Sequence, residues 1–126
     1  MSGRQASLAQ IGAIVVSIDG TGTSRRGQAF RLPAYRNLGT VGLDDHVALL
    51  RQMAARYPYM DLNRVGVFGA SAGGYDAARF ILRRGDVYKV AAAWAGNHEL
   101  RLDKAWWPEV SMGDADLATW DRNSNL

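Results

Sequence analysis

Cysteine is absent from the 126 residues of the sequence, which excludes disulfide bonds, thiolate metal sites and a cysteine nucleophile. No apolar run approaches the roughly 20 residues of a membrane-spanning helix. Residues 1–10 lack the basic start, apolar block and small-residue cleavage site of a signal peptide. A soluble protein is therefore expected, and its cellular compartment stays open.

The excess of one sign of charge over the other is also small. The 15 basic and 12 acidic side chains leave a net charge of +3, and the basic residues are scattered singly or in pairs. This pattern does not predict a nucleic-acid partner. An apolar content of 48% at this length predicts one compact globular unit with its own core.

Apolar runs and amphipathic segments alternate along the chain as far as Gly96. Three runs have the length and β-branched content of buried strands: residues 11–19, 65–69 and 90–95. Two segments between them have helical periodicity: residues 43–54, before Pro58, and residues 77–84. The order predicts an α/β fold, a parallel sheet with helices on both faces. Beyond Gly96, helix and loop are expected over one end of this sheet.

The sequence Gly69-Ala70-Ser71-Ala72-Gly73 lies between a predicted strand and a predicted helix. A serine on such a sharp turn projects its hydroxyl above the carboxyl end of the sheet, and the flanking glycines allow the turn. The strand, turn and helix around Ser71 therefore predict a nucleophile, with the backbone amide of Ala72 as an oxyanion donor. The alternative is a glycine-rich turn with an incidental serine.

A serine nucleophile needs a histidine base and an orienting carboxylate, which follow it in hydrolases of this type. Only 55 residues follow Ser71, and His98 is the one histidine among them. With no later strand to bring it to Ser71, His98 is expected to be a supporting or surface residue. His46, within the first predicted helix, is expected to be solvated or packed.

The segment from Asp19 to Thr23 superficially matches a dinucleotide-binding turn. The G-x-G-x-x-G pattern fails because Arg25 stands where the third glycine belongs, so a structural loop is the preferred interpretation. No cofactor and no metal site are predicted. Four tryptophans remain, and they predict either an apolar pocket near Ser71 or a packed covering layer: Trp94, Trp106, Trp107 and Trp120.

Taken together, these motifs resemble the catalytic domain of the prolyl oligopeptidase family of serine peptidases, and most closely its dipeptidyl-peptidase-IV branch. The resemblance is carried by residues 18–23, 26–27 with Phe30, 35–39, 54–61, 64–69, 71–75 and 95–99. It implies an α/β-hydrolase fold, Ser71 as nucleophile and Ala72 as one oxyanion donor. It also implies that Asn97, Leu100 and Trp107 lie near the pocket for the residue before the scissile bond.

The sequence departs from the family at Thr21, Ala70 and Ala72, which affects the shape of that pocket. By the resemblance, residues 1–126 are a partial hydrolase domain. A tyrosine oxyanion donor would precede them, the triad aspartate and histidine would follow Leu126, and the β-propeller is absent.

The expected function is peptide hydrolysis through an acyl-enzyme on Ser71, with this chain alone inactive. A carboxylesterase of the same fold is one alternative. The other is a non-catalytic fragment that acts in binding or assembly, with self-association through open sheet edges.

Overall fold

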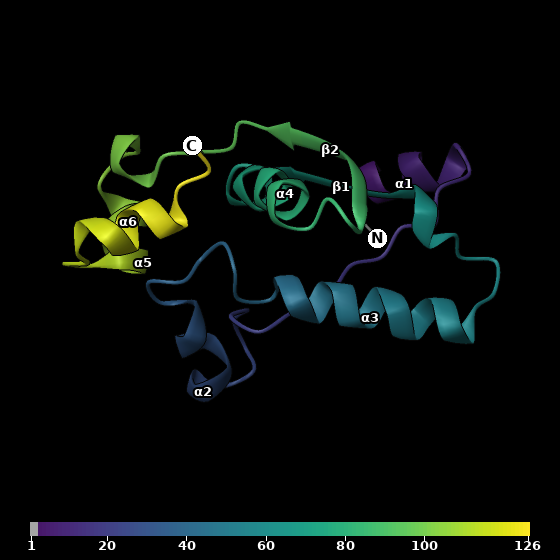
Figure 1. Ribbon diagram of the computed structural model, residues 1–126, viewed down its shortest axis with the longest axis horizontal. Helices are drawn as coiled ribbons and strands as arrows, with labels where there is room; N and C mark the ends of the chain where they lie inside the picture. The colour runs from purple at the N-terminus through teal and green to yellow at the C-terminus, as the bar shows by residue number, and fades with distance from the viewer. Residues whose placement is uncertain (1–2) are drawn as a thin grey trace.

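The computed structural model describes residues 3–126, which form several helices and a two-stranded sheet (Figure 1). Its α-helices are α1 (Gly3–Gln10), α2 (Gln28–Arg31), α3 (Leu43–Arg56), α4 (Ala72–Arg83), α5 (Trp106–Met112) and α6 (Leu117–Asn123). Short 3-10 turns occupy Leu32–Ala34, Leu62–Arg64 and Leu100–Leu102. The strands are β1 (Val65–Ala70) and β2 (Tyr88–Trp94).

The two strands are parallel and are connected through α4, which is the arrangement predicted for the second and third strands. Val65 pairs with Tyr88, and the register then shifts so that Gly66 pairs with Val90. The shift leaves Lys89 without a partner on β1 and turns the residues after it to the opposite faces of β2. The second and third predicted strands and both predicted helices are confirmed, with α4 beginning at Ala72 and not at residue 77.

The core of the sheet region lies between α3, α4 and one face of the strands. Leu43, Val47, Phe80 and Tyr88 form one buried cluster, against which the partly buried strand residues Val65 and Val67 pack. Because α3 and α4 both contribute to this cluster, the two long helices cover the same face of the strands. The acidic residues of the first turn of α3 favour the start of that helix, since negative charge is stabilised at a helix N-terminus.

The prediction of helices on both faces is wrong for the described residues. On the outward face, Phe68, Val90 and Trp94 are 43%, 63% and 65% exposed. The cause is that the α4 crossover and α3 both pack on the side of Val67. Apolar side chains on both sides of a strand predict burial, yet they do not identify the element that provides it.

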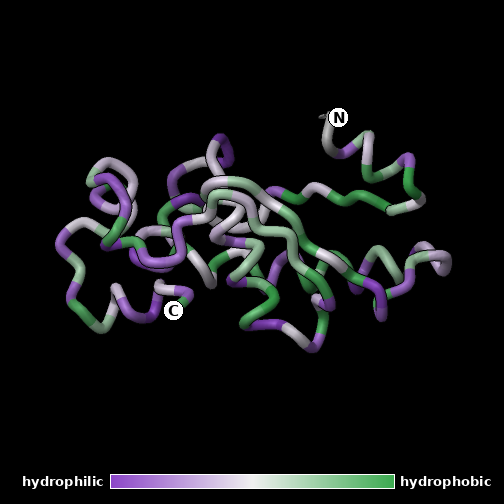
Figure 2. The backbone as a smooth tube through the Cα atoms, turned by 90° about the horizontal axis from the view of Figure 1, so that it is seen from above, coloured by the Kyte–Doolittle hydropathy of each residue, from purple (hydrophilic) through white to green (hydrophobic). Residues whose placement is uncertain are grey.

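The first predicted strand, residues 11–19, is also wrong for this structure. The segment is extended, but none of the backbone–backbone hydrogen bonds in the described chain involves residues 14–19. Ile11 and Ile14 are 80% and 52% exposed, and Figure 2 shows this apolar stretch running apart from the central body after the N-terminal helix. Strand propensity alone does not form a strand, because a ladder needs a partner edge.

The C-terminal helices form a second cluster at one end of the sheet, as expected from the sequence. Tyr75 of α4, Leu100 and Met112 are buried together, and Trp107 and Trp120 pack against them. In Figure 1, α5 and α6 lie together beyond one end of α4. Among residues 3–126, no helix combines the length and apolar character needed to cross a membrane.

Candidate active site

Ser71 occupies the sharp turn between β1 and α4. Its backbone angles are φ 58° and ψ −123°, a conformation that residues with a side chain rarely adopt. Its amide donates a hydrogen bond to the carbonyl of Trp94 at 2.9 Å, which continues the strand pairing into the turn. Such a conformation costs about 1–3 kcal/mol and persists only where the surrounding structure imposes it. The side chain is exposed.

Glycines make this turn possible through close backbone approach. A Cβ atom on Gly69 would collide with the carbonyl group of Gly73. On Gly74 it would lie 2.5 Å from the carbonyl oxygen of Trp94 and 3.0 Å from the Cα atom of Gly96. The first turn of α4 can therefore pack directly on both strand ends, which fixes the position of Ser71.

The N-terminus of α4 supplies donors beside Ser71. The amides of Gly74 and Tyr75 donate to the carbonyl of Ser71 at 2.9 and 3.0 Å. Within residues 3–126, the amides of Ala72 and Gly73 make no such backbone bond, and Ala72 is exposed. The helix dipole adds partial positive charge at this end. An oxyanion formed at Ser71 could be stabilised here.

Neither histidine reaches Ser71 by a hydrogen bond in the described part of the chain. Nδ1 of His46 lies 2.6 Å from the carbonyl oxygen of Gly42, and its ring meets Phe80 edge-on at 5.1 Å between centroids. His98 instead contacts Asn125. The packed alternative for His46 is confirmed, and the general base is not among the contacts of Ser71.

Two of the three predicted pocket residues come together around Tyr75. Leu100 is completely buried, and the Trp107 ring meets that of Tyr75 edge-on at 5.9 Å. Asn97 is partly buried, and its side-chain nitrogen is buried with no hydrogen-bond partner among residues 3–126. The substrate-binding roles of Asn97, Leu100 and Trp107 stay predictions.

Two of the four tryptophans are confirmed in the packed layer, and a pocket role near Ser71 stays a prediction for the other two. Trp107 and Trp120 belong to the packed layer, and the Trp120 indole donates to the carbonyl of Ala115 at 3.0 Å. Trp94 and Trp106 are 65% and 68% exposed.

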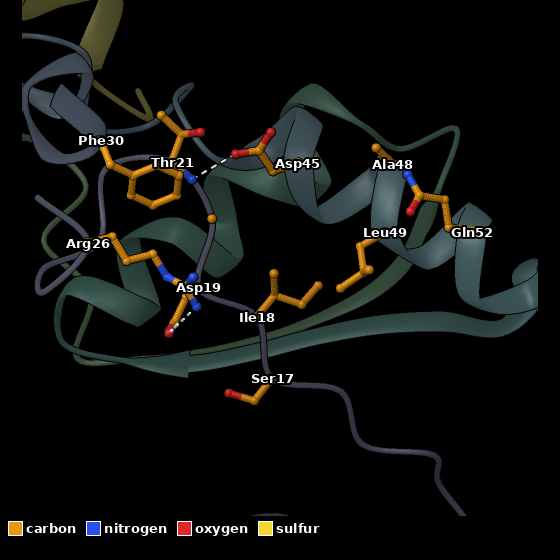
Figure 3. Close-up of a pocket in the computed structure, with 11 residues that line it drawn as sticks. Ser17, Ile18, Asp19, Thr21, Arg26, Phe30, Asp45, Ala48, Leu49 and Gln52 are labelled. Atoms are coloured by element: carbon orange, nitrogen blue, oxygen red, sulfur yellow. Dashed lines mark hydrogen bonds and ion pairs between the residues drawn. The ribbon is translucent and has the colours of Figure 1, made fainter.

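The loop after residues 11–19 borders a separate open cavity of about 580 Å³ beside α3 (Figure 3). The amide of Thr21 donates to the Asp45 carboxylate at 2.7 Å. Hydrogen bonds from the side chain and from the amide of Thr21 lower the pKa of Asp45. Asp19 forms an ion pair with Arg26 at 3.2 Å. Asp45 thus ties the loop to α3, a contact that its place in the first helical turn did not reveal. This agrees with the interpretation of the segment as a structural loop.

Sequence reasoning missed the role of Arg79, which is only 2% exposed within α4. The available signal was its spacing, since Arg79 follows Tyr75 by four residues and so shares its helical face.

An exposed serine in a strained strand-to-helix turn, beside backbone donors, has the geometry of a serine hydrolase elbow. The sequence model of the prolyl oligopeptidase family matches residues 1–124, and the chain belongs to this family.

Several curated proteins are similar to the chain. Human dipeptidyl peptidase 8 is 39% identical over 89 residues, which are 71% of this chain and 10% of that protein. Venom dipeptidyl peptidase 4 of Vespula vulgaris is 37% identical over 70 residues, 56% of this chain and 9% of that protein. Dipeptidyl peptidase family member 1 of Caenorhabditis elegans is 31% identical over 110 residues, 86% of this chain and 14% of that protein. The chain thus spans about a tenth of the length of these relatives.

Proposed function

We propose that this chain carries the nucleophile of a serine peptidase that cleaves peptides through an acyl-enzyme. The observation that carries the proposal is the strained backbone of Ser71, φ 58°, at an exposed turn between β1 and α4. Membership of the prolyl oligopeptidase family supports peptide substrates. The names of the relatives quoted above, all dipeptidyl peptidases, support a dipeptidyl-peptidase type of reaction.

In this proposal the Ser71 oxygen attacks the peptide carbonyl carbon and its proton passes to a base. The Ala72 amide stabilises the resulting oxyanion, the amine departs with a proton, and water then hydrolyses the acyl-enzyme. Since neither His46 nor His98 is hydrogen-bonded to Ser71, we expect turnover by this chain alone to be slow. No step requires a metal or an organic cofactor.

A substrate comparison tests the proposal. The chain and its Ser71→Ala variant are incubated with an Xaa-Pro anilide, a short acyl ester and a fluorophosphonate probe. Slow Ser71-dependent reactions, with the anilide favoured over the ester relative to their uncatalysed rates, support a peptidase. Turnover of the ester alone would support the carboxylesterase alternative. Activity that survives in Ser71→Ala would contradict both.

A non-catalytic role in assembly is favoured by one observation, the open outward face formed by Phe68, Val90 and Trp94. Exposed apolar surface next to open strand edges promotes association. Sedimentation of the wild type and of Phe68→Lys at several concentrations tests this alternative. A wild type that stays monomeric at all concentrations would remove the case for it.

A further inference from the structure

Residues 122–125 lie against α4 and are held there by buried side chains of that helix (Figure 1). The hydroxyl of Tyr75 donates to the backbone carbonyl of Asn123 at 2.6 Å. The guanidinium group of Arg79 donates to the carbonyls of Arg122 and Ser124. A buried guanidinium has lost its hydration, and these carbonyls replace the water at its two terminal nitrogens. Within residues 3–126, Nε of Arg79 is buried and has no hydrogen-bond partner.

Asn125 extends this contact from Arg79 to His98. Its side-chain oxygen lies 3.4 Å from Nη1 of Arg79, and its side-chain nitrogen donates to the carbonyl of Tyr75 at 3.0 Å. Because a carbonyl can only accept, the second contact fixes the orientation of the amide. The same nitrogen lies 3.2 Å from Nδ1 of His98. Nδ1 must therefore accept, and the proton of the neutral imidazole is on Nε2.

The His98 backbone is held by the same segment. Its carbonyl accepts from the Asn125 amide at 2.8 Å and from the Ser124 hydroxyl at 3.4 Å. The ring lies over Gly96, where a Cβ atom would be 2.8 Å from Cε1 of His98. Gly96 in turn packs against Gly74, in the first turn after Ser71. The loop that carries Asn97 and His98 is thus fixed beside the serine turn.

We propose that Arg79 and Asn125 are positioning residues that hold His98 in its Nε2–H tautomer and fix residues 96–100 beside the Ser71 turn. Nδ1 is occupied by a donor and Nε2 carries the proton, so neither nitrogen of His98 can accept the proton of Ser71. His98 is therefore a hydrogen-bond donor and not the base. That residues 96–100 contact substrate rests on the proposed function, whereas the tautomer and the order of the loop do not.

The tautomer is measured directly by NMR on the full chain with ¹⁵N-labelled histidine, at a pH where both imidazoles are neutral. Nδ1 of His46 faces the carbonyl of Gly42 and must carry its proton there, so the two histidines should show opposite tautomers. A His46→Gln variant assigns the signals. The Nδ1–H tautomer at His98, or an equal mixture, in the wild type would overturn the proposal.

Substitution then tests which residues hold the tautomer. Asn125→Ala and Arg79→Met should give a mixed tautomer at His98, and Arg79→Lys should largely preserve the wild-type form. Arg83→Met, at an exposed position one turn further along α4, is the matched control and should change nothing. Asn125→Ala leaves the carbonyl contacts of Arg79 in place, so it decides the question if Arg79→Met does not fold. An unchanged tautomer in Asn125→Ala would contradict the inference.

Hydrogen exchange gives a second readout at the backbone amides of residues 101–103, which donate to the Glu99 carboxylate and to the carbonyls of Glu99 and Leu100. These amides should exchange about tenfold faster in Asn125→Ala, while those of β1 keep the wild-type rate. Wild-type exchange rates at residues 101–103 in Asn125→Ala would contradict the positioning role. Fluorophosphonate labelling of the same samples separates the two proposals. A wild type with the Nε2–H tautomer but no labelling of Ser71 would count against the proposed function alone.

Discussion

Asp76 is an acidic residue in the first half of α4, directly after the buried Tyr75. Burial raises the pKa of its carboxyl group to about 6, and no opposite charge in the described part of the chain lowers it. A carboxyl group with a raised pKa in the folded state is destabilising when it is ionised. Replacement of Asp76 by asparagine should therefore stabilise the protein at neutral pH.

The size of the effect follows from the ordinary pKa of 3.8 and the folded-state value of about 6. Linkage gives a cost of up to about 3 kcal/mol above pH 7, where Asp76 is ionised in both states. The cost falls as the pH drops through 6, because the folded state takes up the proton first, and is about 1 kcal/mol at pH 4.5. Glu99, whose pKa the Arg101 hydrogen bonds lower from 4.5 to about 2, stabilises the fold above pH 4.5, and this contribution is lost as the pH falls from there toward 2.

Urea unfolding followed by tryptophan fluorescence measures this prediction at pH 7.5 and pH 4.5. Asp76→Asn should gain up to about 3 kcal/mol over the wild type at pH 7.5, and about 2 kcal/mol less at pH 4.5. Asp44→Asn is the control, since the Asp44 side chain is 86% exposed and forms only a surface ion pair with Arg84 at 3.4 Å. This variant should lose at most about 1 kcal/mol and should gain none at either pH. If Asp76→Asn gave no gain, or the same gain at both pH values, the reasoning would be refuted.

Two further substitutions test the packing around the serine turn. Gly74→Ala should destabilise the fold, because its Cβ atom would lie 2.5 Å from the Trp94 carbonyl oxygen, whereas a Cβ atom on Gly73 meets nothing within 4 Å. Urea unfolding should rank Gly73→Ala at or above the wild type, and the reverse order would be contrary to this account. Leu43→Ala should cost about 2–5 kcal/mol because Leu43 is 3% exposed in the core, and Leu82→Ala, at a site 64% exposed, should cost far less. Similar losses in both variants would contradict the position of the core.

The sequence was sufficient to predict the strand, turn and helix around Ser71, because three independent signals coincide there. The apolar run of β1 has strand character, the glycines permit the turn, and α4 has helical periodicity. Each signal is local, and the structure that each one predicts is local as well. This is why the bounds of β1 and the C-terminal end of α4 agree closely with the prediction, although α4 begins at Ala72 and not at residue 77.

Features that depend on distant partners were not predictable in the same way. Residues 11–19 have the composition of a strand, but pairing depends on which edge lies next to them. The buried state of Arg79 depends on residues 122–125, more than 40 positions later, whose carbonyls bind it. The protonated nitrogen of His98 depends likewise on Asn125. Such contacts leave no periodic signal in the sequence.

The most direct test of the central claim is the site at which a fluorophosphonate reacts with the folded chain. A stabilising amide at an oxyanion is worth about 100-fold or more in rate, so even without a hydrogen-bonded histidine Ser71 should react faster than the other serines. Peptide mapping by mass spectrometry after long incubation should find the adduct on Ser71, and unfolding in urea should abolish the preference. An adduct on another serine, or an even distribution over all serines of the folded chain, would contradict the assignment of Ser71 as the nucleophile.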